Sequence, residues 1–221
     1  MVFGKKIVIY DLDDTLYPRT QYFSELSDLV MAEALVYDLG LKMDLDKATK
    51  IVYESYRDYR DGGEIFYRDY NINPKDLFYA YHKRKPVEKI VPIDNLLEKL
   101  KKIPAEQYIF TANDISATER ILKHLGLFEF FKDRYFSVEH FDVYKKNKDS
   151  KVYKDICERI GVSPNDCVFV DDSYSNLEFA KEAGMTTVRI YYRNNSAKDK
   201  KFIDYAYKGI ESFLDDVAQC F

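Results

Sequence analysis

The chain has 221 residues, with 34 Lys and Arg against 38 Asp and Glu, so its formal net charge is −4. A hydrophobic fraction of 46% with 33% charged residues excludes global disorder, and the absence of a basic block argues against a nucleic acid polymer as partner. No apolar run approaches the roughly 20 residues of a membrane span. Three widely spaced cysteines, Cys157, Cys167 and Cys220, predict neither a disulfide framework nor a zinc site. We therefore expect a globular, cytoplasmic protein with no membrane partner.

Short β-rich runs alternate with helical patterns along most of the chain. Nearly all-apolar strands separated by helices are typical of a parallel sheet that is covered on both faces. Glycines at the expected helix ends sharpen the alternation. The pattern predicts an α/β fold with a doubly wound, Rossmann-like parallel sheet. The predicted strands are 6–10, 108–111, 135–138, 168–170 and 187–192, and the helices between them are 115–125, 152–160 and 177–183.

One interval departs from this rhythm. Residues 19–89 contain three helical patterns, at 25–39, 46–59 and 76–83, and no convincing strand. We predict an inserted helical domain at 19–89 and an α/β core domain formed by 1–18 and 90–221. The many aromatic residues of the insertion are expected to be core for the most part, with a few lining a cleft.

Acidic residues follow the first predicted strand directly, at Asp11, Asp13 and Asp14, with Thr15 behind them. Open α/β sheets bind their ligands at the carboxyl ends of the strands. Asp11 and Asp13 are two residues apart, so one could act as a nucleophile toward phosphorus and the other as a proton donor. The alternative is an acidic turn that caps the next helix.

A second acidic pair, Asp171 and Asp172, follows the apolar strand 168–170. If the two strands are neighbours, three or more carboxylates share a small volume, which is electrostatically costly without a cation. Mg²⁺ prefers oxygen ligands of this kind. The second pair therefore favours a functional metal site over a capping turn.

A third strand end carries Thr111, Ala112 and Asn113, whose hydroxyl, amide and backbone N–H groups suit a phosphate, although such residues also cap helices. A balancing cation is expected from the lysine-rich segment 145–151. Most lysines in such a run are solvated surface, and one is expected to reach the carboxylates.

These motifs in this order resemble the haloacid dehalogenase superfamily over the whole chain. The resemblance rests on the segment 11–17, on Thr111, on a lysine and on the segment 170–177. It implies a cap domain in the insertion and Mg²⁺-dependent hydrolysis of a phosphate monoester through an aspartyl-phosphate. Asp11 would be the nucleophile and Asp13 the acid/base, whose presence argues against a dehalogenase. The implied metal ligands are Asp11, Asp13 through its carbonyl, Asp171 and Asp172, and the implied phosphate ligands are Thr111, Ala112 and Asn113.

Within the superfamily, the motifs are similar to the pyrimidine 5′-nucleotidase-like group. That similarity implies a nucleoside 5′-monophosphate or a similar small phosphorylated metabolite as substrate, and a monomer or homodimer. The family's Lys-Pro pair is missing, and Lys148 is the best substitute, ahead of Lys146 and Lys151. A sugar-phosphate mutase of the same fold and a non-catalytic module that binds Mg²⁺ and phosphate remain the alternatives.

Overall fold

The computed structural model describes residues 2–146, 148–192 and 200–219. The chain forms two compact units. The first consists of Met1–Pro18, Val91–Ala112 and Leu122–Phe221, and the second of Arg19–Ile90 and Asn113–Ile121. Cys220 lies outside the described residues.

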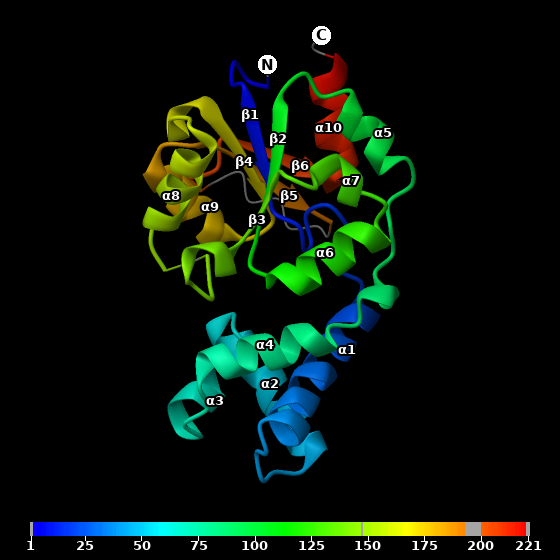
Figure 1. Cartoon of the computed structure of the whole chain (residues 1–221), viewed down its shortest axis with the longest axis vertical. Helices are drawn as coiled ribbons and strands as arrows, with labels where there is room; N and C mark the ends of the chain where they lie inside the picture. Colours follow the sequence, from blue (N-terminus) through cyan, green and yellow to red (C-terminus); the bar gives the residue numbers. More distant parts are fainter. Residues whose placement is uncertain (1, 147, 193–199, 220–221) are drawn as a thin grey trace. The chain divides into compact units, whose positions relative to one another are not determined.

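The first unit is built on a parallel sheet of six strands, which confirms the predicted α/β fold class (Figure 1). The strand order is β3-β2-β1-β4-β5-β6, and β1 and β4 therefore lie side by side at the centre. Every residue of β1 and β4 is buried, as expected for apolar strands covered on both faces. The strands are β1 Ile7–Tyr10, β2 Glu106–Thr111, β3 Tyr135–Ser137, β4 Cys167–Asp171, β5 Thr186–Tyr191 and β6 Tyr205–Lys208.

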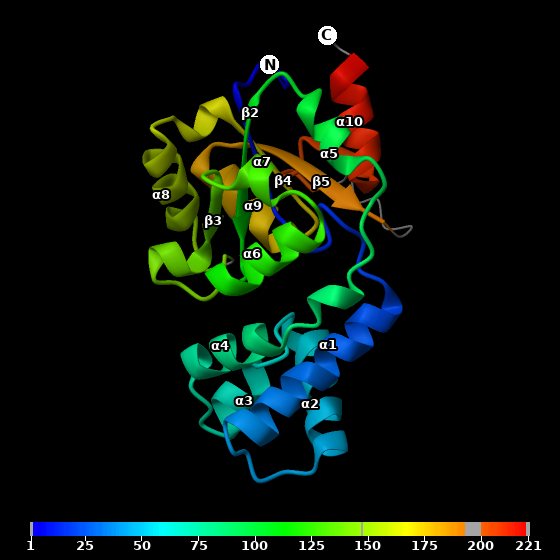
Figure 2. The same ribbon diagram turned by 45° about the vertical axis from the view of Figure 1, so that its right-hand side comes forward.

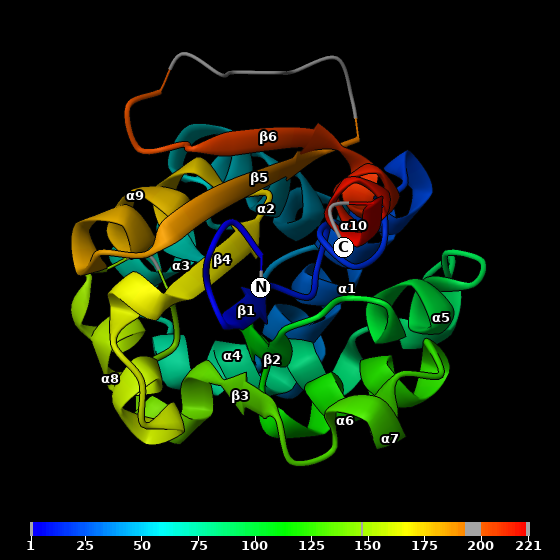
Figure 3. The same cartoon turned by 90° about the horizontal axis from the view of Figure 1, so that it is seen from above.

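Helices cover both faces of this sheet. Figure 3 shows α8 and α9 on one face, and α5 and α10 on the other. α8 and α9 end at Gly161 and Gly184, whose φ angles of 80° and 105° are the left-handed conformation that glycine adopts without strain. The helices of this unit are α5 Leu96–Lys101, α7 Phe128–Phe131, α8 Lys151–Ile160, α9 Tyr174–Ala183 and α10 Gly209–Gln219, with short 3₁₀ turns at Val138–Phe141 and Pro164–Asp166. α6 Ile115–His124 begins in the second unit, which also contains a 3₁₀ turn at Val87–Lys89.

The second unit is helical. Its helices are α1 Gln21–Glu33, which continues into a π-helical segment at Ala34–Asp38, α2 Leu45–Tyr59, α3 Glu64–Asp69 and α4 Pro74–Arg84. α1 and α2 pack side by side (Figure 2). Side-chain caps from Thr20, Asp44 and Asn73 begin α1, α2 and α4. Its core gathers small and aliphatic side chains around Phe66, while six tyrosines are exposed: Tyr22, Tyr37, Tyr53, Tyr56, Tyr59 and Tyr70.

The start of α6 packs with the second unit, whereas the sequence placed residues 113–121 in the α/β domain. Arg120 explains the difference, because its guanidinium donates hydrogen bonds to the carbonyl oxygens of His82 and Lys85 at the end of α4. Among the described residues, no helix is long and apolar enough to cross a membrane.

Candidate functional site

The sheet order creates a switch point between β1 and β4. From β1 the chain continues to β2 and β3 on one side, and β4 is followed by β5 and β6 on the other. Ligands of open α/β sheets bind in the crevice at such a point, beyond the carboxyl ends of the strands. The residues that lie there are Asp11, directly after β1, and Asp171 with Asp172, at the end of β4.

Three carboxylates converge at this point. One oxygen from each of Asp11, Asp171 and Asp172 lies within 4.8 Å of the others. Asp11 is 5% exposed and Asp171 is fully buried, while Asp172 is half-buried. The arrangement that the sequence predicted from two acidic strand ends is therefore present in the folded chain.

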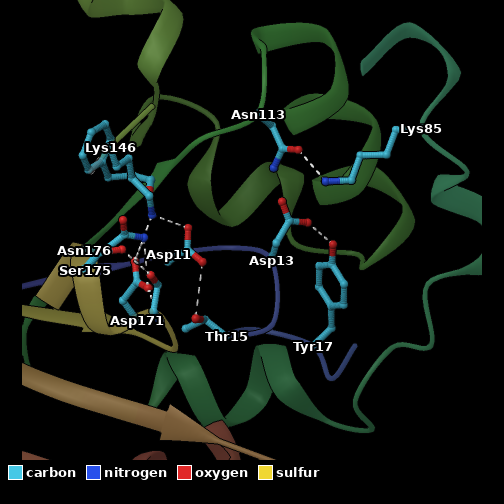
Figure 4. Close-up of polar contacts among 12 residues, drawn as sticks. Asp11, Asp13, Thr15, Tyr17, Lys85, Asn113, Lys146, Asp171, Ser175 and Asn176 are labelled. Atoms are coloured by element: carbon cyan, nitrogen blue, oxygen red, sulfur yellow. Dashed lines mark hydrogen bonds and ion pairs between the residues drawn. The ribbon is translucent and has the colours of Figure 1, made fainter. Parts of the chain in front are cut away.

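Lys146 supplies the positive charge among these carboxylates (Figure 4). Lys146 is 3% exposed, and its ammonium group donates hydrogen bonds to Asp11 Oδ1 at 2.5 Å and Asp171 Oδ2 at 2.9 Å. A third bond reaches the carbonyl oxygen of Phe110 in β2, at 3.2 Å. One lysine thus bridges the ends of β1, β2 and β4.

The charges at this site are unbalanced. Burial raises the pKa of Asp11; Lys146 opposes this rise, and the like charges of Asp171 and Asp13 add to it. Burial and the neighbouring carboxylates also raise the pKa of Asp172. Burial lowers the pKa of Lys146, but Asp11 and Asp171 outweigh it and hold that pKa above its ordinary value. Lys146 therefore stays protonated, and a single cation faces at least three acidic groups.

Asp171 is the most tightly held carboxylate of the site. The backbone N–H of Ser173 donates to its Oδ1 at 2.7 Å, and the Asn176 amide donates to both oxygens at 3.2 and 3.0 Å. Together with Lys146, these donors fix the orientation of Asp171. Ser173 and Asn176 belong to the motif that the sequence singled out, but their role as donors to Asp171 is visible only in the fold.

A tight turn carries Asp13 away from β1. Asp14 has a φ of 59°, a left-handed conformation that Asp tolerates better than most residues. Thr15 donates to Asp11 Oδ2 at 3.4 Å, and the hydroxyl of Tyr17 donates to the carboxylate of Asp13. Asp13 is half-buried and close enough to Asp11 to raise the pKa of Asp11 by its charge. Sequence reasoning missed the contact of Tyr17 with Asp13, for which the spacing of four residues was the available signal.

Thr111 is fully buried at the end of β2, next to β1, and the half-buried Ala112 follows it. Asn113 belongs to the second unit, where its side-chain oxygen accepts a hydrogen bond from Lys85 at 2.5 Å. Lys85 is itself 5% exposed, a rare degree of burial for a lysine. Nothing in the sequence pattern had singled out Lys85.

The site lysine differs from the residue that the sequence favoured. Lys148 is exposed, and Lys151 forms a surface pair with Asp155, whereas Lys146 is the lysine on Asp11 and Asp171. Lys148 was preferred as the best substitute for the missing Lys-Pro pair. The loop before α8 instead brings the earlier lysine to the strand ends, which corrects that choice.

Two aromatic rings lie close to the ammonium group of Lys146. Its Nζ lies 5.5 Å from the ring centroids of both Phe110 and Phe169. Tyr153 packs edge-on against the same two rings, at 5.7 and 5.2 Å. These apolar walls exclude water from the ion pairs and so strengthen them.

The donor set fits a hard divalent cation. Three carboxylates within 4.8 Å offer the oxygen ligands that Mg²⁺ takes, and the raised pKa values of Asp11 and Asp172 show that Lys146 alone does not neutralise them. Sulfur ligands are absent from this cluster, which argues against a softer metal.

Two curated proteins are similar to this chain over most of its length. Among curated proteins, the chain is 29% identical over 218 residues to a glyceraldehyde 3-phosphate phosphatase of Pyrococcus furiosus, covering 91% of this chain and 87% of that protein. A protein of the same name from Methanocaldococcus jannaschii is 26% identical over 227 residues, covering 96% of both chains.

The fold has counterparts among solved structures. A putative beta-phosphoglucomutase from Thermotoga maritima superposes with a TM-score of 0.63 at 21% identity, covering 98% of this chain and 100% of that one. The model of the family described as haloacid dehalogenase-like hydrolase matches residues 5–184. This match spans both acidic strand ends and Lys146, and the chain belongs to the haloacid dehalogenase-like hydrolase family.

Proposed function

We propose that the protein is a Mg²⁺-dependent phosphatase that hydrolyses a small phosphate monoester through an aspartyl-phosphate on Asp11. The observation that carries this proposal is the placement of Asp11 at the switch point of the sheet, ion-paired with Lys146 at 2.5 Å and followed two residues later by Asp13. A carboxylate in this position can attack phosphorus, which an amide of the same shape cannot do.

The first step joins Asp11 to the phosphoryl group. A carboxylate oxygen of Asp11 bonds to phosphorus as the ester P–O bond breaks, and Asp13 gives its proton to the leaving alkoxide. Tyr17, through its hydrogen bond, orients Asp13 for this transfer. Lys146 offsets charge on the phosphoryl oxygens near Asp11, and Thr111 lies at the adjacent strand end to bind them.

The second step releases phosphate. Asp13 takes a proton from water as the water oxygen bonds to phosphorus and the bond to Asp11 breaks, which restores both carboxyl groups. Asp11, Asp172 and the Asp13 carbonyl would hold Mg²⁺ directly, with Asp171 as a direct or water-bridged ligand. The bound ion would supply electrostatic stabilisation of the phosphoryl oxygens.

A covalent intermediate is the most direct test of this mechanism. Acid quenching during turnover should trap phosphate on the peptide that contains Asp11, and the Asp11→Asn variant should give no such peptide. A variant that still releases phosphate at the wild-type rate would contradict the role of Asp11.

Two substrate classes have support. The curated relatives that cover about nine-tenths of the chain or more are named as glyceraldehyde 3-phosphate phosphatases, which favours a short phosphorylated aldehyde or sugar. The nucleotidase-like motifs and the aromatic-rich helical unit favour a nucleoside 5′-monophosphate, since a base stacked on an aromatic ring gains about 1–3 kcal/mol. We propose the short sugar phosphate as the first candidate, because the relatives that match this chain over most of its length carry that activity in their names.

The ratio kcat/KM decides between these classes. The substrates to compare are glyceraldehyde 3-phosphate, phosphoglycolate, glucose 6-phosphate, UMP, CMP and AMP, all with Mg²⁺ present. A preference of tenfold or so for UMP or CMP would restore the nucleotidase assignment and leave the phosphatase mechanism intact.

The alternatives are a mutase and a non-catalytic module. A mutase would return an isomerised hexose phosphate rather than inorganic phosphate, which product analysis separates. A module would bind Mg²⁺ and phosphate without turnover, and the presence of Asp13 with its partner Tyr17 counts against it, because binding alone has no need of an acid/base group.

A further inference from the structure

Two cysteines meet at the end of the sheet opposite to the carboxylates. Cys157 lies in α8 and Cys167 is the first residue of β4, and both are fully buried. Their sulfur atoms are 3.6 Å apart, although the residues are ten positions apart in the chain. A disulfide bond joins sulfur atoms at about 2 Å, so a shift of less than 2 Å would bring these two thiols into bonding distance.

An open cavity lies beside this pair, lined by residues next to the two cysteines in the chain. It has a volume of about 610 Å³, and its lining includes Glu158, Gly161, Val162, Ser163 and Asp166. Glu158 is adjacent in sequence to Cys157, and Asp166 is adjacent to Cys167. The Cys167 thiol also donates to the carbonyl oxygen of Ser163 at 3.5 Å, so the wall of the cavity touches the pair directly.

We propose that Cys157 and Cys167 form a dithiol site that closes to an intrachain disulfide when the protein meets a low-molecular-weight disulfide. The thiolate of one cysteine attacks the oxidant, releases one thiolate of it and forms a mixed disulfide. The second cysteine thiolate then attacks the sulfur of the first, which forms the Cys157–Cys167 bond and releases the other half of the oxidant. The protein loses two protons and two electrons, and the oxidant becomes two thiols.

The reaction is slow. The hydrogen bond to Cys167, together with burial, raises the pKa of the Cys157 thiol, so that little thiolate is present at neutral pH. The pair is therefore a stabilising clip that is set over hours rather than a fast sensor. The disulfide ties α8 to β4 and lowers the conformational entropy of the unfolded chain by closing the loop between the two cysteines.

The clip leaves the catalytic end of the sheet untouched. Cys167 and Asp171 stand at opposite ends of β4, four positions apart, or about 13 Å of strand. We therefore expect the oxidised protein to keep its phosphatase activity within about twofold. This inference does not depend on the proposed function, because its readouts are a mass and a melting temperature.

Peptide mapping tests the proposal on the folded protein. The reduced wild-type chain is incubated with 2-hydroxyethyl disulfide and digested with trypsin under non-reducing conditions. Cleavage at Lys154, Arg159 and Lys181 leaves the two cysteines on separate peptides, 155–159 and 160–181. The expected product is these two peptides joined by a disulfide, in the wild type and equally in the Cys220→Ser variant.

The melting temperature tests the stabilising role. We expect the Tm of the oxidised protein to exceed that of the reduced protein by roughly 3–8 °C, and Cys157→Ala to show no such difference. A persistent mixed disulfide on either cysteine without the joined peptide, or thiols that stay reduced after days with the oxidant, would overturn the proposal. A joined peptide with an unchanged or lower Tm would overturn the claim that the disulfide stabilises the protein. The wild-type result stands even if Cys157→Ala fails to fold.

Discussion

The backbone N–H of Asp11 donates to the carbonyl oxygen of Val170 at 2.8 Å. This bond continues the ladder between β1 and β4 by one residue beyond Tyr10, so that Asp11 and Asp171 leave neighbouring strands side by side. The spacing of these carboxylates is set by two fully buried strands rather than by a loop. Substitutions that keep the shape of the side chain should therefore change the chemistry of the site and leave its geometry in place.

Asp11→Asn is the substitution that tests the proposed nucleophile. We expect phosphatase activity to fall by at least about three orders of magnitude, because an amide cannot attack phosphorus. The Tm of the metal-free variant should be equal to or higher than that of the wild type, because burial and the charges of Asp171 and Asp13 disfavour an ionised Asp11. Thermal unfolding with a phosphate-release assay measures both. Loss of activity together with a collapsed Tm would mean that Asp11 holds the fold instead.

Lys146 is buried and Lys148, two positions later, is exposed, so substitutions of the two lysines serve as test and control. We expect Lys146→Ala to lose most activity and about 3–5 kcal/mol of stability, because it leaves Asp11 and Asp171 buried without their cation. Lys148→Ala should keep both near wild-type values. Activity and the free energy of unfolding in denaturant are the measurements. An inactive Lys148→Ala with an active Lys146→Ala would reinstate the choice made from the sequence.

The lysine shows where sequence reasoning ends. The acidic strand ends could be predicted because an apolar strand and the polar residue after it are neighbours in the chain, and the sheet then brings such ends together. The contact between Lys146 and Asp11 spans 135 positions and depends on the path of the loop before α8. No local pattern distinguishes Lys146 from Lys148 within that loop.

The same reasoning accounts for the predicted and missed elements. Five strands were predicted because each carries a short run rich in apolar or aromatic residues, and in β1 and β4 that run is buried throughout. β6 was missed because it is a short strand of four residues, none of them buried, that ends in a lysine. α10 was also missed, although its buried face, which includes Phe213 and Val217, packs against the sheet domain. The packing of the start of α6 with the helical unit could not be predicted either, because the bonds of Arg120 to the end of α4 are long-range.

Mg²⁺ titration should separate the two residues of the second acidic pair. Asp171 already accepts hydrogen bonds from Lys146, Ser173 and Asn176, whereas Asp172 is half-buried next to it. We expect Asp172→Ala to raise the Mg²⁺ concentration for half-maximal activity more than Asp171→Ala does, by about tenfold or more. A chelator should abolish wild-type activity, and added Mg²⁺ should restore it. Equal or reversed effects of the two substitutions would exchange their roles.

Tyr153 carries a stability prediction. Its hydroxyl is the one buried side-chain oxygen or nitrogen without a hydrogen-bond partner among the described residues. Tyr153→Phe removes this group and keeps the ring contacts with Phe110 and Phe169, so we expect a gain of about 1 kcal/mol. Tyr10→Phe is the control, because the equally buried Tyr10 hydroxyl donates to Gln107 and its removal should destabilise. Equal effects of both substitutions on denaturant unfolding would show that the Tyr153 hydroxyl has a partner in solution.

We expect the ionised carboxylate of Asp204 to stabilise the folded protein at neutral pH and to lose this effect in acid. Its carboxylate accepts hydrogen bonds from Lys181 at 2.6 and 2.7 Å and from the backbone N–H of Thr187 in β5 at 2.9 Å. Burial raises the pKa of Asp204, but the bonds from Lys181 and Thr187 outweigh it and hold that pKa below its ordinary value. The ionised form of Asp204 is therefore the stabilising one. Its stabilisation is fully present above the pKa of an unfolded Asp, about 3.9, and is lost as the pH falls through the lower pKa of the folded state.

We expect Asp204→Asn to lower the Tm by roughly 2–4 °C at neutral pH, and this difference to shrink toward zero below about pH 4. Lys181→Met should show a smaller version of the same dependence, because Thr187 remains. A difference between wild type and Asp204→Asn that stays constant from neutral pH down to acid unfolding would mean that the charge of Asp204 contributes nothing.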